Sequence, residues 1–195
     1  MNLRNLWKKK DVTLSFEAFP PKKDDDFASV AAAVEQIAQL KPDFMSVTYG
    51  AGGGTSAYTA RIARIVEEHG VAALAHLTCV SSNRDQIRQE LAALQQAGIH
   101  NILALRGDYP QGYDPAAPRD YRYARDLVED IVDYGGFTVG GACYPEGHVE
   151  CASQQEDLEH LKEKVDCGVD FLITQMFFDN SALYSFLYRA QQVGI

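Results

Sequence analysis

The sequence lacks the features of several large protein classes. It has no apolar run near the roughly 20 residues that a membrane-spanning helix needs, and its basic first ten residues have no apolar core of the signal-peptide kind. Its cysteines form no C-x-x-C pair, which argues against a disulfide framework and a zinc ribbon. The four are Cys79, Cys143, Cys151 and Cys167. We therefore expect a cytoplasmic protein without a metal site.

Positive charge is also scarce. The 195 residues carry 27 acidic and 18 basic side chains, a formal net charge of −9. A nucleic-acid or anionic-membrane surface would need an excess of Lys and Arg, so neither partner is expected. Small molecules are the expected ligands, and 46% hydrophobic content at this length suffices for one sizeable core.

Short apolar segments that are typical of strands recur along the whole chain. They span residues 12–19, 44–49, 71–79, 101–106, 137–144 and 169–178. Between them lie helical patterns, in which apolar residues recur at intervals of three and four. Ser82 and Ser153 begin capping-box patterns, and Asn180 is a third predicted N-cap. Glycines at 70, 98, 135, 168 and 194 are predicted to end helices.

Alternating strands and helices predict an α/β protein with a parallel sheet and right-handed crossovers. A dinucleotide-binding doubly wound sheet would need G-x-G-x-x-G after the first strand, and this motif is absent there. The glycine-rich stretch at 50–55 follows the second strand and is predicted to be a loop. The remaining architecture is the (β/α)8 TIM barrel.

A barrel places functional side chains at the carboxyl ends of successive strands. This sequence has a polar residue at each of six such ends, spaced by 28 to 38 residues. They are Glu17, Thr48, His76, Arg106, Tyr144 and Gln175. Six in a row favour one shared site. Because eight units take about 250 residues, we expect residues 1–195 to be a single catalytic barrel domain with about six βα units, cut before the seventh strand.

Several of these residues allow two interpretations. Glu17 ends an apolar strand, where burial would favour a protonated general acid, but it could equally pair with a neighbouring cation. Arg106 and Asp108 flank Gly107, so they could address different parts of a ligand or pair with each other. His76 is typical of a core histidine. Gln175 could recognise a heterocycle edge or satisfy loop backbone.

Taken together, the motifs resemble those of the methylenetetrahydrofolate reductase family. They are S-F-E-x-F-P-P at 15–21, V-T-Y-G-A-G-G at 47–53, A-H-L-T at 75–78, L-R-G-D-x-P at 105–110, Y-P-E-x-H at 144–148, D-L-x-x-L-K-x-K at 157–164 and T-Q-x-F-F-D at 174–179. They follow the family's order over the whole chain. Ala18 departs from the pattern, because the family has an aromatic residue there.

The resemblance implies a flavoprotein oxidoreductase of one-carbon metabolism, of the bacterial FAD-dependent type. In this reaction NAD(P)H reduces FAD, and the flavin then reduces 5,10-methylenetetrahydrofolate to 5-methyltetrahydrofolate by a ping-pong route. NADH is the family's usual bacterial donor, although the sequence does not exclude NADPH. Self-association into a homo-oligomer is also implied.

The resemblance assigns roles to individual residues. Glu17 matches the general acid, Asp108 matches a carboxylate beside flavin and folate, and Gln175 matches the amide that holds folate. A further set matches the positions at which the family contacts FAD. It consists of Thr48, Tyr49, Ala51, His76, Arg106, Gly107, Asp108, Tyr123, Ala124, Tyr144, His148, Asp157, His160 and Lys164.

Two alternatives stay open at this point. One is a flavin-binding but inactive barrel fragment, since the family draws part of its substrate pocket from the seventh and eighth units. The other is a cofactor-free barrel lyase or aldolase that uses Glu17 and Lys164.

Overall fold

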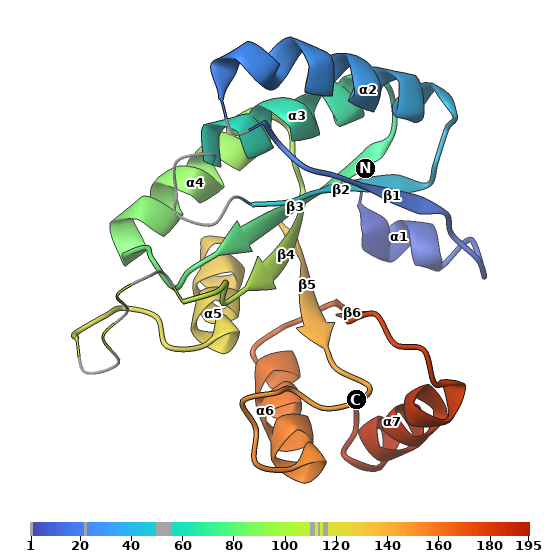
Figure 1. Cartoon of the computed structure of the whole chain (residues 1–195), viewed down its shortest axis with the longest axis vertical. Helices are drawn as coiled ribbons and strands as arrows, with labels where there is room; N and C mark the ends of the chain where they lie inside the picture. The colour runs from blue at the N-terminus through green and yellow to red at the C-terminus, as the bar shows by residue number, and fades with distance from the viewer. Residues whose placement is uncertain (1, 22, 50–55, 110–111, 113, 115–116) are drawn as a thin grey trace.

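The structure is a computed structural model, and it describes residues 2–21, 23–49, 56–109, 112, 114 and 117–195. Strands and helices alternate from β1 onward, as the sequence predicted (Figure 1). The elements are α1 (Leu3–Trp7), β1 (Ser15–Ala18), the 3-10 turn η1 (Asp24–Asp26), α2 (Phe27–Gln39), β2 (Phe44–Val47), α3 (Ser56–Glu68), β3 (Ala72–Thr78), α4 (Arg84–Gln96), β4 (Asn101–Leu105), α5 (Ala124–Tyr134), β5 (Thr138–Cys143), α6 (Gln154–Asp166), β6 (Phe171–Thr174) and α7 (Asn180–Gln192). Within the described residues, no helix is long and apolar enough to cross a membrane.

The described strands form one parallel sheet in chain order, β1 to β6. Each strand therefore pairs with the next one along the chain, and the helix between them crosses on the outer side. The twisted sheet curls into half of a barrel, with α2 to α5 along its outside and α6 and α7 beside β6 (Figure 1). This confirms the predicted α/β barrel architecture with six βα units.

Alternation along the strands separates two apolar layers. On β3, Ala73, Ala75 and Leu77 belong to the layer that packs under the outer helices, whereas Ala72 and Leu74 face the concave side. Both layers are shielded from solvent, because all of these residues are fully buried. The strands are therefore apolar on both faces, and polar groups are left for the strand ends.

The short helix α1, which the sequence patterns did not predict, covers the amino ends of the strands. Leu3 is fully buried there, and its backbone N–H donates to Asn101 Oδ1 at 2.9 Å. The Trp7 ring centroid lies 4.5 Å from that of Phe171 and 6.0 Å from that of Phe44. The helix thus connects β2, β4 and β6 on the side of the sheet opposite the predicted site.

The helix ends confirm most of the predicted signals and correct two of them. All five glycines predicted to end helices have positive φ, between 75° and 115°. Ser153 Oγ accepts from the Glu156 N–H, as predicted. However, α4 is capped by Asn83 rather than Ser82, and α7 by Asp179 rather than Asn180, because in each case the neighbouring side chain reaches the free N–H groups of the first turn.

Candidate active site

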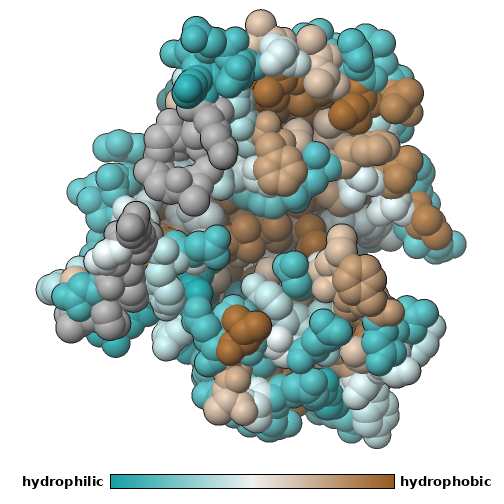
Figure 2. Space-filling model, in the orientation of Figure 1, coloured by the Kyte–Doolittle hydropathy of each residue, from teal (hydrophilic) through white to brown (hydrophobic). Residues whose placement is uncertain are grey.

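The six predicted strand-end residues lie at one edge of the sheet. Glu17 and His76 are within β1 and β3, and the others directly follow their strands. Because the strands are parallel, their carboxyl ends face the same side. In the space-filling view the molecule is hollowed between its upper part and the part that carries α6 and α7, and apolar side chains are visible in the recess (Figure 2).

A first cavity, here called the strand-end cavity, has a volume of about 460 Å³. It contains all three residues predicted to act on substrate: Glu17, Asp108 and Gln175. Its walls also include predicted cofactor positions, namely Tyr49, His76, Arg106, Gly107, Tyr144 and His148. The loop and strand positions that the sequence indicated separately therefore meet in one space.

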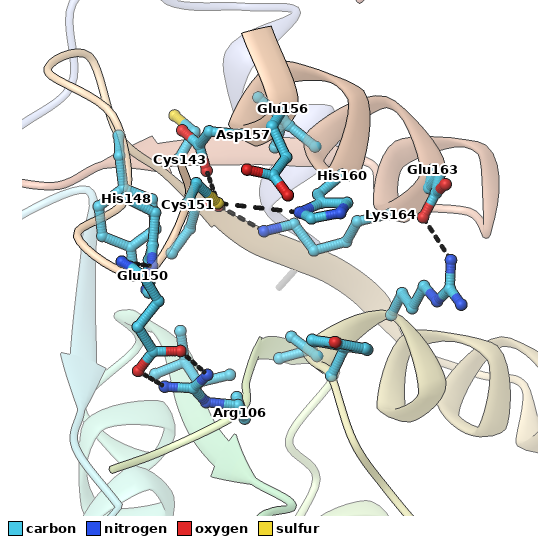
Figure 3. A pocket seen from close by; sticks show the side chains of 18 of the residues that line it. Arg106, Cys143, His148, Glu150, Cys151, Glu156, Asp157, His160, Glu163 and Lys164 are labelled. Atoms are coloured by element: carbon cyan, nitrogen blue, oxygen red, sulfur yellow. Dashed lines mark hydrogen bonds and ion pairs between the residues drawn. The ribbon is translucent and has the colours of Figure 1, made fainter. Parts of the chain in front are cut away.

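A second cavity, here called the helix-side cavity, lies between β4, β5, the first turn of α5 and one side of α6, and it has a volume of about 510 Å³ (Figure 3). The predicted cofactor positions in its lining are Arg106, Tyr123, Ala124, Tyr144, His148, Asp157, His160 and Lys164. Arg106, Tyr144 and His148 line both cavities, so the two cavities adjoin at a shared wall.

Two predicted cofactor residues are not brought into this lining. As formed by the described residues, neither cavity includes Thr48, whose carbonyl oxygen accepts a hydrogen bond from Thr59 Oγ1 at 3.0 Å. Ala51 lies outside the described residues.

Glu17 is held by its neighbours in the sheet. Strand register places it opposite Ser46, whose hydroxyl donates to Glu17 Oε2 at 3.2 Å. The same oxygen lies 3.6 Å from His76 Nε2. The expected apolar enclosure of this carboxyl is wrong for the described residues, because the Glu17 side chain is 47% exposed on strand β1. The carboxylate is positioned, but it is accessible to water.

His76 is a buried imidazole with an unused ring nitrogen. The residue is 9% exposed, and Nε2 has no hydrogen-bond partner among the described residues. Burial lowers the pKa of His76, and the nearby Glu17 carboxylate only partly opposes this effect. The ring is therefore neutral near pH 7 and presents a polar atom to the strand-end cavity.

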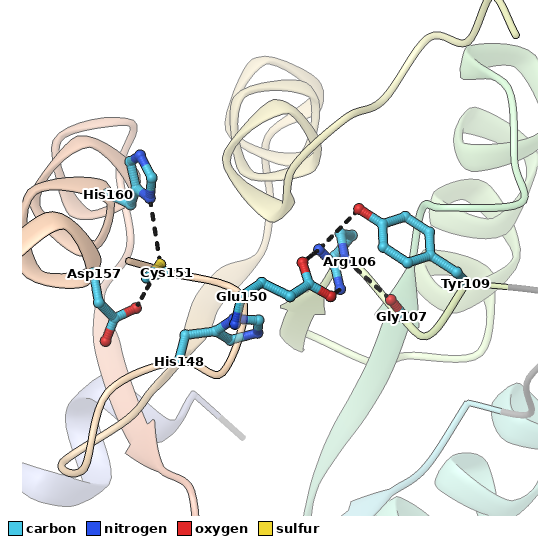
Figure 4. A network of polar contacts seen from close by, with 8 residues as sticks. All are labelled: Arg106, Gly107, Tyr109, His148, Glu150, Cys151, Asp157 and His160. Carbon is cyan, nitrogen blue, oxygen red and sulfur yellow. Dashed lines mark hydrogen bonds and ion pairs between the residues drawn. The ribbon is translucent and has the colours of Figure 1, made fainter. Parts of the chain in front are cut away.

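Arg106 extends from the end of β4 between the two cavities (Figure 4). Its Nη1 and Nη2 atoms lie 2.5 and 2.8 Å from the two carboxylate oxygens of Glu150. The hydroxyl of Tyr109 accepts a third hydrogen bond at 3.1 Å, and the tyrosine ring centroid is 4.3 Å from the guanidinium carbon. The ion pair raises the pKa of Arg106 and lowers that of Glu150.

The glycine after Arg106 is required by the backbone. Gly107 has φ of +85°, and a Cβ atom there would lie 3.0 Å from Cβ of Thr78 on the neighbouring strand. Any other residue would be strained and would press on β3. Of the two interpretations of Arg106 and Asp108, the mutual ion pair does not form, because Arg106 binds Glu150 instead. Sequence reasoning missed Glu150, since a single acidic residue in a loop carries no distinguishing pattern.

Lys164 supplies a second cation, from α6. Its Nζ donates to the carbonyl of Ala142 at 2.6 Å, and burial lowers its pKa. The lysine stem crosses β5 at Gly141, where a Cβ atom would lie 3.3 Å from Lys164 Cε. A glycine in this strand therefore lets the ammonium reach the edge of the helix-side cavity.

A thiol lies beside two further predicted cofactor residues (Figure 4). Cys151 Sγ is 3.8 Å from Asp157 Oδ1 and 3.8 Å from His160 Nδ1. Burial is the main cause that raises the pKa of Cys151, so the thiol is protonated at neutral pH. Within the part of the chain that the structure describes, no three His, Cys, Asp or Glu side chains are arranged to hold a metal ion.

Known structures share the fold. A protein from Clostridium thermocellum that binds two copies of 5-methyl-5,6,7,8-tetrahydrofolic acid matches 98% of this chain and 64% of its own, with a TM-score of 0.64 at 14% identity. Oxaloacetate acetylhydrolase matches 96% of this chain and 66% of its own, with a TM-score of 0.65 at 11% identity. At such identities the likeness concerns the fold alone.

Relatives found by sequence identify the family of the chain. The 5,10-methylenetetrahydrofolate reductases of Pectobacterium carotovorum and Escherichia coli K12 are 39% and 37% identical over 94% of this chain, and methylenetetrahydrofolate reductase (NADH) 1 of Arabidopsis thaliana is 35% identical over 99%. The chain covers 61% of each bacterial relative and 35% of the plant one. A family model described as methylenetetrahydrofolate reductase matches residues 2–195. With these motifs gathered at one edge of a half barrel, the chain belongs to the methylenetetrahydrofolate reductase family.

Proposed function

We propose that this chain carries the catalytic site of a flavin-dependent reductase that converts 5,10-methylenetetrahydrofolate to 5-methyltetrahydrofolate with NADH or NADPH. The observation that supports this most is that the two cavities adjoin at a shared wall. The strand-end cavity holds Glu17, Asp108 and Gln175, and the helix-side cavity holds eight of the predicted cofactor positions. A substrate and a cofactor bound in these two cavities would meet at their shared wall.

The residues of the site fit FAD on three counts. The unused Nε2 of His76 is a buried polar atom that a heterocycle could satisfy. Arg106 and Lys164 are cations for a diphosphate. Tyr123 and Tyr144 offer aromatic surface in the same lining. When bound, FAD would supply two-electron chemistry, accepting hydride from the nicotinamide and passing it to the folate.

The protein's own part in the reaction is proton transfer and charge stabilisation. Substrate in the strand-end cavity would exclude water from Glu17, which favours its protonated form. Glu17 could then donate a proton to the ring nitrogen that leaves when the imidazolidine opens, while the Ser46 hydroxyl holds the carboxyl in place. The exposed carboxylate of Asp108 would stabilise the cation that forms, and Gln175 would orient the folate by donating and accepting together.

The same geometry argues against the lyase alternative. Glu17 lines only the strand-end cavity and Lys164 only the helix-side cavity. A cofactor-free mechanism that joins the two groups on one small substrate would need them in one space.

The test is a flavin titration followed by two half-reactions. The 195-residue chain is titrated with FAD, reduced anaerobically with NADH or NADPH, and then mixed with methylenetetrahydrofolate, with the Escherichia coli reductase as the positive control. We expect flavin binding, bleaching by the nicotinamide and recovery of colour with the folate. Binding without turnover would support the inactive flavin-binding alternative. A folded chain that binds no flavin would contradict the proposal.

A further inference from the structure

Glu150 occupies the anion-binding fork of Arg106. Both carboxylate oxygens are used, at 2.5 and 2.8 Å from the two terminal guanidinium nitrogens (Figure 4). This two-point geometry is the one that a phosphate group also makes with arginine. Both residues line the helix-side cavity, where a phosphate-bearing ligand is proposed to bind.

The loop between β5 and α6 aims this carboxylate. The backbone N–H of Glu150 donates to His148 Nδ1 at 3.1 Å, and that of Cys151 donates to the His148 carbonyl at 3.0 Å. The N–H of Ala152 donates to the Glu156 carboxylate at 2.6 Å. With its backbone held on both sides, Glu150 has a defined position opposite Arg106 rather than a chance one.

The other charges of the cavity make this contact consequential. The cationic side chains of its lining are Arg106, Arg125 and Lys164, and the acidic ones are Glu150, Glu156, Asp157 and Glu163. Arg125 is paired with Glu163, and Lys164 donates to a backbone carbonyl. Arg106 is more buried than Arg125, 19% against 42% exposed, whereas its partner Glu150 is 46% exposed. The Glu150 carboxylate can therefore turn out to solvent while the Arg106 guanidinium stays in the wall of the cavity.

We propose that Glu150 is a built-in competitor for the phosphate of the ligand. Its carboxylate neutralises Arg106 while the site is empty, and it must turn out to solvent before a phosphate oxygen can take its place. This inference rests on the proposed function, in that FAD is the expected ligand. Only a ligand whose phosphate binds Arg106 well enough to displace Glu150 is then bound. The competition lowers the affinity of the site for every such phosphate-bearing ligand.

The test compares Glu150→Gln with the wild-type chain in fluorescence titrations with FAD, FMN and riboflavin. Glutamine keeps the size of the side chain and removes the charge, so we expect FAD and FMN to bind about two- to five-fold more tightly, the range for a partly exposed ion pair. Riboflavin, which has no phosphate, should bind unchanged. Glu146→Gln is the matched control, because it removes the same charge from the same loop outside both cavities.

A purely structural role predicts the opposite result. If the ion pair only anchors the loop, Glu150→Gln should weaken all three flavins, and this would overturn the proposal. In an Arg106→Gln background the competitor has no target, so adding Glu150→Gln should change nothing. A gain in FAD affinity of the same size in the Arg106→Gln background would also overturn the proposal.

ADP separates this inference from the proposed function. If no variant binds flavin but Glu150→Gln binds ADP more tightly through Arg106, the flavoprotein assignment fails and the competition stands. If the wild-type chain binds FAD and the variant tightens neither FAD nor ADP, the competition fails and the flavoprotein assignment stands.

Discussion

At the scale of single residues, Glu17 and His76 define what the strand-end cavity can do. One is an accessible carboxylate on β1, and the other is a buried neutral imidazole on β3, with 3.6 Å between Oε2 and Nε2. The two groups differ in exposure and in hydrogen bonding, so they can serve different roles in the site. Each role can be tested separately.

Removing the acid should affect only one half of the reaction. In Glu17→Gln we expect reduction of methylenetetrahydrofolate to slow by about 10²- to 10⁴-fold, the usual contribution of a general acid. Reduction of the flavin by the nicotinamide should persist, because no proton from Glu17 is needed there. Stopped-flow traces of the two half-reactions measure this. Glu35→Gln, on the exposed face of α2, is the control, and equal losses in both half-reactions would refute the assigned role.

His76 makes stability depend on pH in a predictable direction. Its pKa is lower in the folded protein than the ordinary 6.5, so below pH 6.5 the unfolded chain binds more protons than the folded one. Folding stability due to this group is therefore full above pH 6.5 and is lost as the pH falls toward the lowered value. We expect His76→Gln to lose less stability than wild type between pH 7.5 and about 5.5. Urea unfolding at both values tests this, with the exposed His100→Gln as the control.

At the scale of elements, β5 and β6 fit together because β5 lacks side chains where β6 has large ones. A Cβ atom on Gly140 would lie 2.4 Å from the Phe171 ring, which itself packs on Trp7 of α1. The glycine therefore fixes how closely the last two strands and the amino-end helix approach.

Filling this space should be destabilising. We expect Gly140→Ala to lower the free energy of unfolding by about 1–3 kcal/mol, because a rigid aromatic ring would have to move in a packed layer. Chemical denaturation measures the loss. Adding Phe171→Leu should restore part of it if the ring is the cause. An unchanged midpoint in Gly140→Ala would contradict the packing described here.

The sequence predicted the elements better than their contacts. The order of the strands and the glycine helix ends follow from local periodicity and backbone conformation, so they were predicted correctly. The predicted segments 12–19 and 169–178 extend past β1 and β6 at both ends. The caps at Ser82 and Asn180 were each wrong by one residue, because neighbouring Asn83 and Asp179 can make the same bonds. The helix α1 was missed because five residues carry too short a pattern, and its stability comes from distant strands.

In the candidate site, too, the positions of residues could be predicted better than their contacts. Residues at strand ends could be predicted because parallel topology brings them to one edge whatever their chemistry. The Arg106–Glu150 pair could not, since it joins positions 44 residues apart through a loop whose path depends on several backbone hydrogen bonds. Charge type alone favoured Asp108, two residues away, as the partner.

At the scale of the whole molecule, the protein is acidic, whereas the ligands of the proposed function are anions. The net charge of −9 repels FAD and nicotinamide nucleotides at long range, whereas Arg106 and Lys164 act only within the cavity.

Salt should therefore speed association. We expect the association rate constant for FAD to rise about two-fold between 0.01 and 0.15 M ionic strength, because the Debye length falls from about 30 to about 8 Å. Stopped-flow quenching of flavin fluorescence measures it, and neutral riboflavin should show no such change. A rate that falls with salt would mean that the local cations dominate the approach of the ligand.

The amino-end helix also has a consequence for synthesis on the ribosome. Asn101, which accepts from the Leu3 N–H, follows Leu3 by 98 residues in the chain, and the ring that packs on Trp7 comes from β6. A nascent chain can form β1 to β4 with their covering helices while this helix still lacks part of its docking surface. Helix α1 is thus made before the six described strands but is secured only after them, and its docking marks the point at which β1 to β6 are in place.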